Sequence, residues 1–155
     1  MKRLLLILLC VPLIGIAQDC EGDCENGFGK IVYDAATSNV PHLEQYNGSF
    51  YKGERSGLGW MLWKLMEDDG TWMVYEYSGG WARGNRSGTG KTSASKCGWL
   101  EEYEYQPFFE DLIWTHTGEY VNGKRNGIGI LMRADDTGYV GYWVNGKLIK
   151  TIAEF

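Results

Sequence analysis

The fold is decided by one stretch of the sequence, Tyr46-Asn47-Gly48-Ser49-Phe50-Tyr51-Lys52-Gly53-Glu54-Arg55-Ser56-Gly57-Leu58-Gly59. Alternate residues of an extended segment point to one face, so Tyr46 and Phe50 share a face and bracket a glycine. The central Lys52-Gly53-Glu54-Arg55 supplies residues suited to the positive φ angles of a tight turn. The bare backbone of Gly57-Leu58-Gly59 then offers a flat surface for rings of the neighbouring strand. The stretch predicts a β-hairpin with rings packed over glycines.

The same pattern of aromatic residues, glycines and a basic residue recurs along the chain. Two further copies occupy residues 77–90 and 116–129, the second with a histidine in place of the leading tyrosine. A fourth copy begins at Tyr139 and loses its final glycines, while residues 26–29 keep only the second half of the unit. Incomplete copies at the two ends are typical of repeat arrays.

This pattern resembles the MORN repeat, a short unit rich in glycine and aromatic residues, and the resemblance covers nearly all of the chain after its first residues. The resemblance implies an all-β fold, an elongated antiparallel meander of MORN-type β-hairpins in a single twisted sheet. The array occupies residues 46–155, and residues 18–45 form an N-terminal half-repeat cap and a loop. The resemblance also implies a module that binds protein partners and, less securely, lipid.

Two insertions interrupt the array. The leading glycines of successive copies are 31, 39 and 23 residues apart, which places the insertions near residues 64–76 and 91–115. The second insertion concentrates rings among acidic residues: Trp99, Tyr103, Tyr105, Phe108, Phe109 and Trp114. One interpretation is an extra hairpin in which Gly98–Tyr105 returns as Phe108–Trp114, because alternating rings on strands usually pack together. The other interpretation is an aromatic surface specific to a partner.

Residues 1–17 have the pattern of a cleaved signal peptide. The charged start Met1-Lys2-Arg3 precedes the apolar run Leu4–Leu9 and a softer stretch that ends in small residues. A membrane-spanning helix needs about 20 apolar residues, and this run is too short. We expect cleavage after Ala17 and export, so that the mature protein is secreted or lies in the periplasm or cell envelope.

The mature chain is acidic. Without residues 1–17 it holds 13 basic and 20 acidic residues, a net charge of −7, compared with −5 for the full chain. No run of lysine and arginine is longer than two residues. Nucleic acids and anionic membranes are both recognised by basic patches. We therefore expect no nucleic-acid partner, and an anionic membrane is disfavoured.

The cysteines of the mature chain predict one disulfide, which export permits. Cys20 and Cys24 are close enough in sequence to close a small loop, and Cys97 is then left as the free thiol. A metal site would need a fourth ligand, and His42 and His116 occur in unrelated contexts. We expect no metal.

The sequence contains no convincing catalytic motif. The stretch Ser87–Thr92 resembles a phosphate-binding loop only in part, because Asn85 replaces the required glycine and no apolar helix follows. Acidic clusters such as Glu67-Asp68-Asp69 suit solvated turns, since a single-layer sheet has no deep cleft in which a pair of carboxylates could act. We expect neither an enzyme nor a cofactor.

The expected function is that of a non-catalytic exported repeat module, which binds or scaffolds a protein or peptide through an aromatic sheet face. A single-layer sheet cannot bury both faces, so part of the ring stripe should remain accessible. The candidate binding residues are Phe50, Trp81, Trp99, Tyr105, Tyr120 and Trp143. The alternative is a carbohydrate-binding module of the cell envelope, in which exposed rings serve as stacking platforms for sugars.

Overall fold

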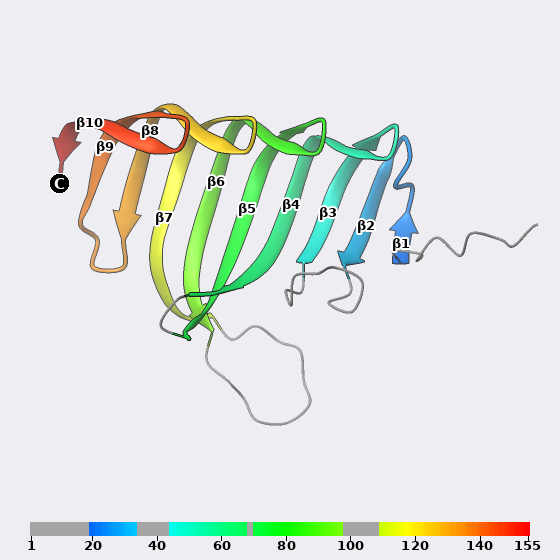
Figure 1. Ribbon diagram of the computed structural model, residues 1–155, viewed down its shortest axis with the longest axis horizontal. Coiled ribbons are helices and arrows are strands. Elements are labelled where there is room, and N and C mark those ends of the chain that lie inside the picture. Colours follow the sequence, from blue (N-terminus) through cyan, green and yellow to red (C-terminus); the bar gives the residue numbers. More distant parts are fainter. Residues whose placement is uncertain (1–18, 34–43, 68–69, 98–108) are drawn as a thin grey trace, which may run out of the picture.

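The computed structural model describes residues 19–33, 44–67, 70–97 and 109–155, and these form one open sheet of ten antiparallel strands (Figure 1). The strands lie in the sheet in their chain order, so the fold is a pure meander and the predicted all-β architecture is confirmed. They are β1 (Asp19–Gly22), β2 (Phe28–Tyr33), β3 (Glu44–Tyr51), β4 (Glu54–Met66), β5 (Trp72–Ala82), β6 (Asn85–Cys97), β7 (Phe109–Val121), β8 (Lys124–Arg133), β9 (Gly138–Val144) and β10 (Lys147–Glu154). The described residues contain no helix, and hence none that is long and apolar enough to cross a membrane.

Four tight turns join the strands of the repeat hairpins. In each turn both central residues have positive φ, as a two-residue loop of type I′ requires. The pairs are Lys52 and Gly53, Arg83 and Gly84, Asn122 and Gly123, and Asn145 and Gly146. In the second hairpin the first turn residue is Arg83, which adopts φ 51° although it is neither glycine nor asparagine.

A row of glycines crosses the sheet at one level. The register pairs a glycine with a glycine from strand to strand, through Gly22, Gly29, Gly48, Gly59, Gly79, Gly90, Gly118, Gly129 and Gly141. A Cβ atom added to Gly48 would lie 2.5 Å from the Cα of Gly59, so the strands leave no room for side chains here. This row is the bare surface that the sequence predicted, with one correction: Gly57 is required for its φ of 72° and has no ring over it.

Eight aromatic rings lie over the glycine row, alternating from strand to strand. We call these eight residues the ring ladder. Successive members meet at centroid distances between 4.7 and 6.0 Å, nearly all edge to face, the arrangement that aromatic pairs favour. In order they are Phe50, Tyr46, Trp81, Tyr77, Tyr120, His116, Trp143 and Tyr139. Seven of the eight are buried, Tyr139 being partly buried, so the ladder is the core of this single-layer protein.

Two tyrosines of the ladder are fixed through their hydroxyls. Tyr46 donates to the carbonyl oxygen of Ser49 at 3.0 Å, and Tyr77 donates to that of Gly80 at 3.0 Å. Burial raises the pKa of both hydroxyls to about 12, so they remain protonated donors near neutral pH. Each ring is thereby held flat across the glycine row.

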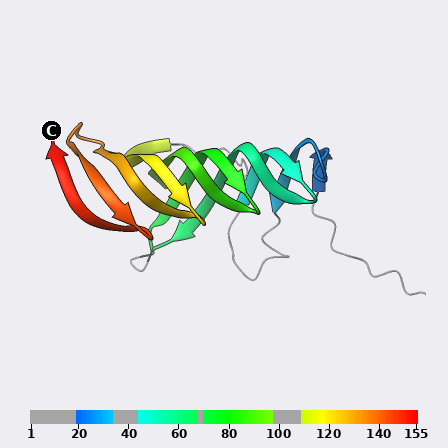
Figure 2. The ribbon, with the colours of Figure 1, turned by 90° about the horizontal axis from the view of Figure 1, so that it is seen from above.

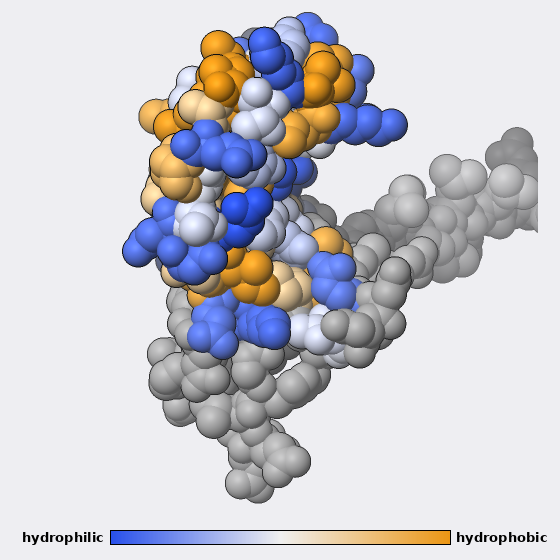
Figure 3. Space-filling view, turned by 90° about the vertical axis from the view of Figure 1, so that its left-hand side faces the viewer, coloured by the Kyte–Doolittle hydropathy of each residue, from blue (hydrophilic) through white to orange (hydrophobic). Residues whose placement is uncertain are grey.

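The sheet curls around the ring ladder. Viewed from its C-terminal end the molecule is C-shaped, with a hollow along one side (Figure 3), and from above the strands cross its long axis obliquely (Figure 2).

Adjacent hairpins are also bonded at their tips, where the backbone N–H of the turn glycine of one hairpin donates to an arginine carbonyl of the hairpin before it. These bonds join Gly84 to Arg55 at 3.0 Å, Gly123 to Arg86 at 2.9 Å and Gly146 to Arg125 at 2.9 Å.

The insertions lengthen strands of the meander. Strands β4 and β5 remain paired from Gly57–Trp81 to Met66–Trp72, and β6 and β7 remain paired as far as Cys97–Phe109. The prediction of an extra hairpin is therefore wrong in its pairing, because the backbone from Phe109 to Trp114 pairs with Ala94–Cys97 of β6. Residues 98–108 lie outside the described part of the chain. Residues 34–43, which belong to the expected N-terminal cap and loop, and residues 1–17, the expected signal peptide, also lie outside it.

The N-terminal edge of the sheet is closed by a disulfide between Cys20 and Cys24, the pair expected from the sequence. Cys24 packs beside the buried core cluster, and its sulfur lies where a Cβ on Gly29 would be. The cysteine therefore takes, at the edge, the place over the glycine row that rings take elsewhere. The side chain of Cys97 is outside the described set.

We expect replacement of Cys20 and Cys24 by serine to loosen the N-terminal edge alone. A disulfide across such a short loop stabilises by about 1–2 kcal/mol, so backbone amides of β1 and β2 should exchange with solvent roughly tenfold faster. Native-state hydrogen exchange measures this, with Cys97→Ser as the control. Equal acceleration in β5–β7 would contradict a local role.

Candidate binding face

The structure places four predicted binding residues in the core. Phe50, Trp81, Tyr120 and Trp143 do share one face in register, but they are 5%, 5%, 1% and 2% exposed. The expectation that part of this stripe stays accessible is wrong for these four, because the curled sheet and the neighbouring rings cover them. Trp99 and Tyr105 lie outside the described residues.

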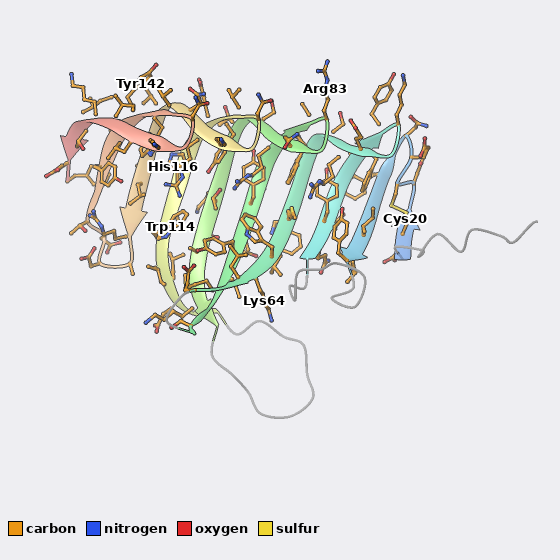
Figure 4. All side chains as sticks on the ribbon, in the orientation of Figure 1. Cys20, Lys64, Arg83, Trp114, His116 and Tyr142 are labelled. Atoms are coloured by element: carbon orange, nitrogen blue, oxygen red, sulfur yellow. A yellow bond between two sulfur atoms is a disulfide. The ribbon has the colours of Figure 1, made fainter. Side chains whose placement is uncertain are left out.

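A second set of rings lies on the same face, farther from the hairpin turns. Trp63, Tyr75 and Trp114 occupy one level of the sheet and are only partly buried. Trp63 stacks on Tyr75 at 5.5 Å with 13° between the planes, and Tyr75 lies 6.3 Å from Trp114. We call these three residues the groove rings, since they line the hollow side of the sheet; Figure 4 shows Trp114 there.

Three arginines lie above the groove rings and the ring ladder. Arg55, Arg86 and Arg125 occupy the same position in successive hairpins, on β4, β6 and β8, each opposite a ladder ring across the hairpin. Because Phe50, Trp81 and Tyr120 point into the hollow, their partners point there too. We call these three residues the arginine row.

Each guanidinium of the arginine row rests on aromatic rings. Arg55 lies 4.6 Å from the ring centre of Trp81, and Arg125 lies 4.6 Å from that of Trp114. Arg86 lies 5.3 to 5.6 Å from three rings and donates to the carbonyl oxygen of Gly123 at 2.6 Å. Cation–π contacts of this kind stabilise a guanidinium and hold it in place.

No carboxylate neutralises the arginine row among the residues that the structure describes. Burial is the main cause that lowers the pKa of Arg86, and neighbouring Arg125 and Arg55 lower it further. Glu76 and Glu119 alternate with inward residues of β5 and β7, so they face the other side of the sheet. Glu67, which accepts the hydroxyl of Tyr75 at 2.9 Å, lies after the end of β4. Among the described residues the arginine row is therefore a positive cluster in a protein that is negative as a whole, while Glu67 places one negative charge at Tyr75.

His116 is the unusual member of the ring ladder. Its Nδ1 lies 3.0 Å from the hydroxyl of Tyr120, which in turn lies 2.7 Å from that of Thr92, while Nε2 is buried without a hydrogen-bond partner. Burial, together with Arg125, lowers the pKa of His116 to about 4. The imidazole is therefore neutral at physiological pH. It packs as a core ring. Among the described residues, no group of three or more histidine, cysteine, aspartate or glutamate side chains is placed to hold a metal ion.

The outer face of the sheet carries scattered apolar residues. On the C-terminal strands Ile128, Ile130 and Tyr142 are 60%, 42% and 42% exposed, and Tyr142 points away from the hollow in Figure 4. These side chains provide control positions for experiments on the hollow side.

The fold and its two faces define an open, linear repeat protein of β-hairpins whose concave side is lined by aromatic rings and arginines. The model of the MORN repeat matches the chain at residues 46–64, 77–95, 116–137 and 139–148, which cover the four hairpins from β3 to the start of β10. The chain belongs to the MORN-repeat family. No curated protein sequence matches it significantly. The first match begins at Tyr46, the leading residue of the copy from which the fold was predicted.

Proposed function

We propose that this protein is a non-catalytic module that binds an extended segment of a partner protein along the hollow side of its sheet. MORN repeats are generally binding or scaffolding modules. The observation that supports this use of the hollow is the alignment of the arginine row with the groove rings. Three cations and three partly buried rings follow the long axis of the molecule, across the strands, where an elongated ligand can contact all of them.

An extended polypeptide suits this surface better than a compact ligand. The contacts repeat from hairpin to hairpin, so each hairpin offers the same type of site to successive parts of a chain. Rings and arginines are the side chains that most often dominate the energy of protein interfaces. We further propose, from the signal-peptide pattern of residues 1–17, that this interaction takes place outside the cytoplasm, in the secreted or cell-envelope space.

Carbohydrate remains the alternative ligand class. Sugars stack on the open faces of tryptophan and tyrosine rings, which on this sheet are Trp63, Tyr75 and Trp114. However, Trp63 is already stacked on Tyr75, and guanidiniums lie over Trp63 and Trp114. The protein's own groups thus occupy ring faces that a sugar would need, which favours the peptide.

Selection from a displayed library of random peptides tests the proposal. We expect selected peptides to bind the wild-type protein and to lose at least tenfold in affinity on Trp114→Ala, a change at a partly buried ring. Ile130→Ser on the outer face of β8 serves as the matched control and should leave affinity unchanged. Circular dichroism and thermal melting establish that both variants fold.

Two results would overturn this assignment. Peptides that lose affinity on Ile130→Ser but not on Trp114→Ala would place the binding surface on the outer face. A library that gives no binder, together with a glycan array that gives binding lost on Trp114→Ala, would favour the carbohydrate alternative.

A further inference from the structure

The arginine row has a fixed repeat distance. Its members lie on every second strand of the sheet, β4, β6 and β8, at equivalent positions. Adjacent strands are about 4.8 Å apart, so neighbouring arginines are spaced by roughly 9.6 Å along the hollow. Their contacts with Trp81, Tyr120 and Trp114 limit how far the guanidiniums can move from these positions.

The chemistry of the row specifies an anionic partner. A guanidinium is a planar fork of donors that binds a carboxylate through two parallel hydrogen bonds. The described residues provide no carboxylate to any member of the row, and the hollow is enclosed by rings that lower its exposure to water. A carboxylate that enters the hollow therefore gains a stronger charge-assisted bond than it would on an open surface.

The repeat distance distinguishes among polypeptide conformations. A polyproline II helix has three residues per turn and rises about 3.1 Å per residue, so every third side chain lies on one face at intervals of about 9.3 Å. In a β-strand the same-face interval is about 6.7 Å. An α-helix repeats its face every seventh residue, about 10.5 Å, but is about 10 Å wide and less able to enter a hollow lined by side chains.

From this match we propose that the hollow binds an acidic polyproline II segment with a glutamate or aspartate at every third residue, each carboxylate paired with one member of the arginine row. This inference rests on the proposed function and names its ligand class. The segment lies parallel to the long axis of the sheet. Its remaining side chains, prolines among them, pack against the edges of the groove rings, which the protein's own stacking leaves free.

Fluorescence anisotropy with labelled synthetic peptides tests the match. The probe is (Glu-Pro-Pro)4, and the control peptide has the same composition with its glutamates at alternating spacings of two and four residues. We expect the probe to bind at least tenfold more tightly than the control peptide, because only the probe presents its carboxylates on one face. Its affinity should decrease with rising salt concentration.

Variants of the protein test the arginine row itself. Arg125→Gln and Arg55→Gln should each weaken binding of the probe by roughly tenfold or more, the loss expected for one charge-assisted hydrogen-bonded pair. Arg83→Gln is the matched control, since it removes the same charge from an exposed residue at a hairpin tip that points away from the hollow (Figure 4). Arg86→Gln is a weaker test because Arg86 also supports the core, so its thermal melting must be compared first.

Several outcomes would overturn the inference. Equal binding of both peptides, or equal loss on Arg83→Gln and Arg125→Gln, would indicate general charge attraction. Tighter binding of a helical peptide with glutamate at every seventh residue would reject the polyproline II conformation. Displacement of the probe by polygalacturonate at lower carboxylate concentration would favour an acidic polysaccharide. If library peptides bind the hollow and the probe does not, the inference fails while the proposed function stands; if neither binds, both fail.

Discussion

Substitution of Gly59 by valine is expected to destabilise the protein by about 2–4 kcal/mol, and to lower its melting temperature by roughly 10 °C. A Cβ on Gly59 would collide with the ring and hydroxyl of Tyr46. That ring is fully buried between Phe50 and Trp81 and is bonded to the carbonyl of Ser49, so it cannot move aside without disturbing the ladder. Valine's preference for strands does not offset this collision.

A double-mutant cycle assigns the loss to the ring. In a Tyr46→Ala background the same Gly59→Val change should be less than half as destabilising, because the colliding ring is absent. Leu58→Thr, one residue away on the outer face and 74% exposed, is the control and should change stability by no more than about 0.5 kcal/mol. An undiminished penalty in the Tyr46→Ala background would refute the account of rings packed over glycines.

When the pH falls from 6.5 to 4, the contribution of His116 to the free energy of unfolding is expected to fall by about 3 kcal/mol. The unfolded chain binds a proton on this histidine below pH 6.5, whereas the folded chain resists protonation until about pH 4. Between these values the unfolded state holds more protons, so stability falls as the pH falls. Above pH 6.5 neither state is protonated, and this contribution is complete.

The His116→Tyr variant removes this pH dependence and tests its origin. Tyrosine stands at the equivalent position in the two preceding repeats, where its hydroxyl donates to the carbonyl three residues later. Urea denaturation of both proteins at pH 7.5, 5.5 and 4.0 gives the comparison. Carboxylates such as Asp23 and Asp135, whose pKa values are lowered by hydrogen bonds, are common to both proteins and cancel. Parallel loss of stability in the two proteins would show that His116 is not responsible.

The architecture could be predicted from the sequence because its determinants are local. A hairpin with glycine at fixed offsets from aromatic residues requires only alternation along a strand and positive φ in a turn. The pairing within the second insertion could not be predicted in this way. Phe109–Trp114 has the same alternating rings whether it pairs with Gly98–Tyr105 or with the end of β6, and only the register chooses between them.

The accessible face was harder to predict than the fold. Whether Trp81 and Tyr120 are core or surface depends on how strongly the sheet curls, which alternation along one strand does not determine. The members of the arginine row are 31 and 39 residues apart in sequence, so they form no run of basic residues from which a positive surface could be predicted. The signal was present in the repeat itself, as an arginine at the same place in three copies.

The bonds between neighbouring hairpin tips have an evolutionary consequence. Each turn glycine bonds only to the hairpin before it, and each strand pairs only with its neighbours in the chain. Duplication of one hairpin inside the gene would therefore insert a unit that both flanking hairpins can accept without redesign. Tandem duplication would lengthen the sheet by two strands at a time, and loss of a copy would shorten it equally. The reach of the molecule can in this way be adjusted over generations while the architecture of every remaining hairpin stays the same.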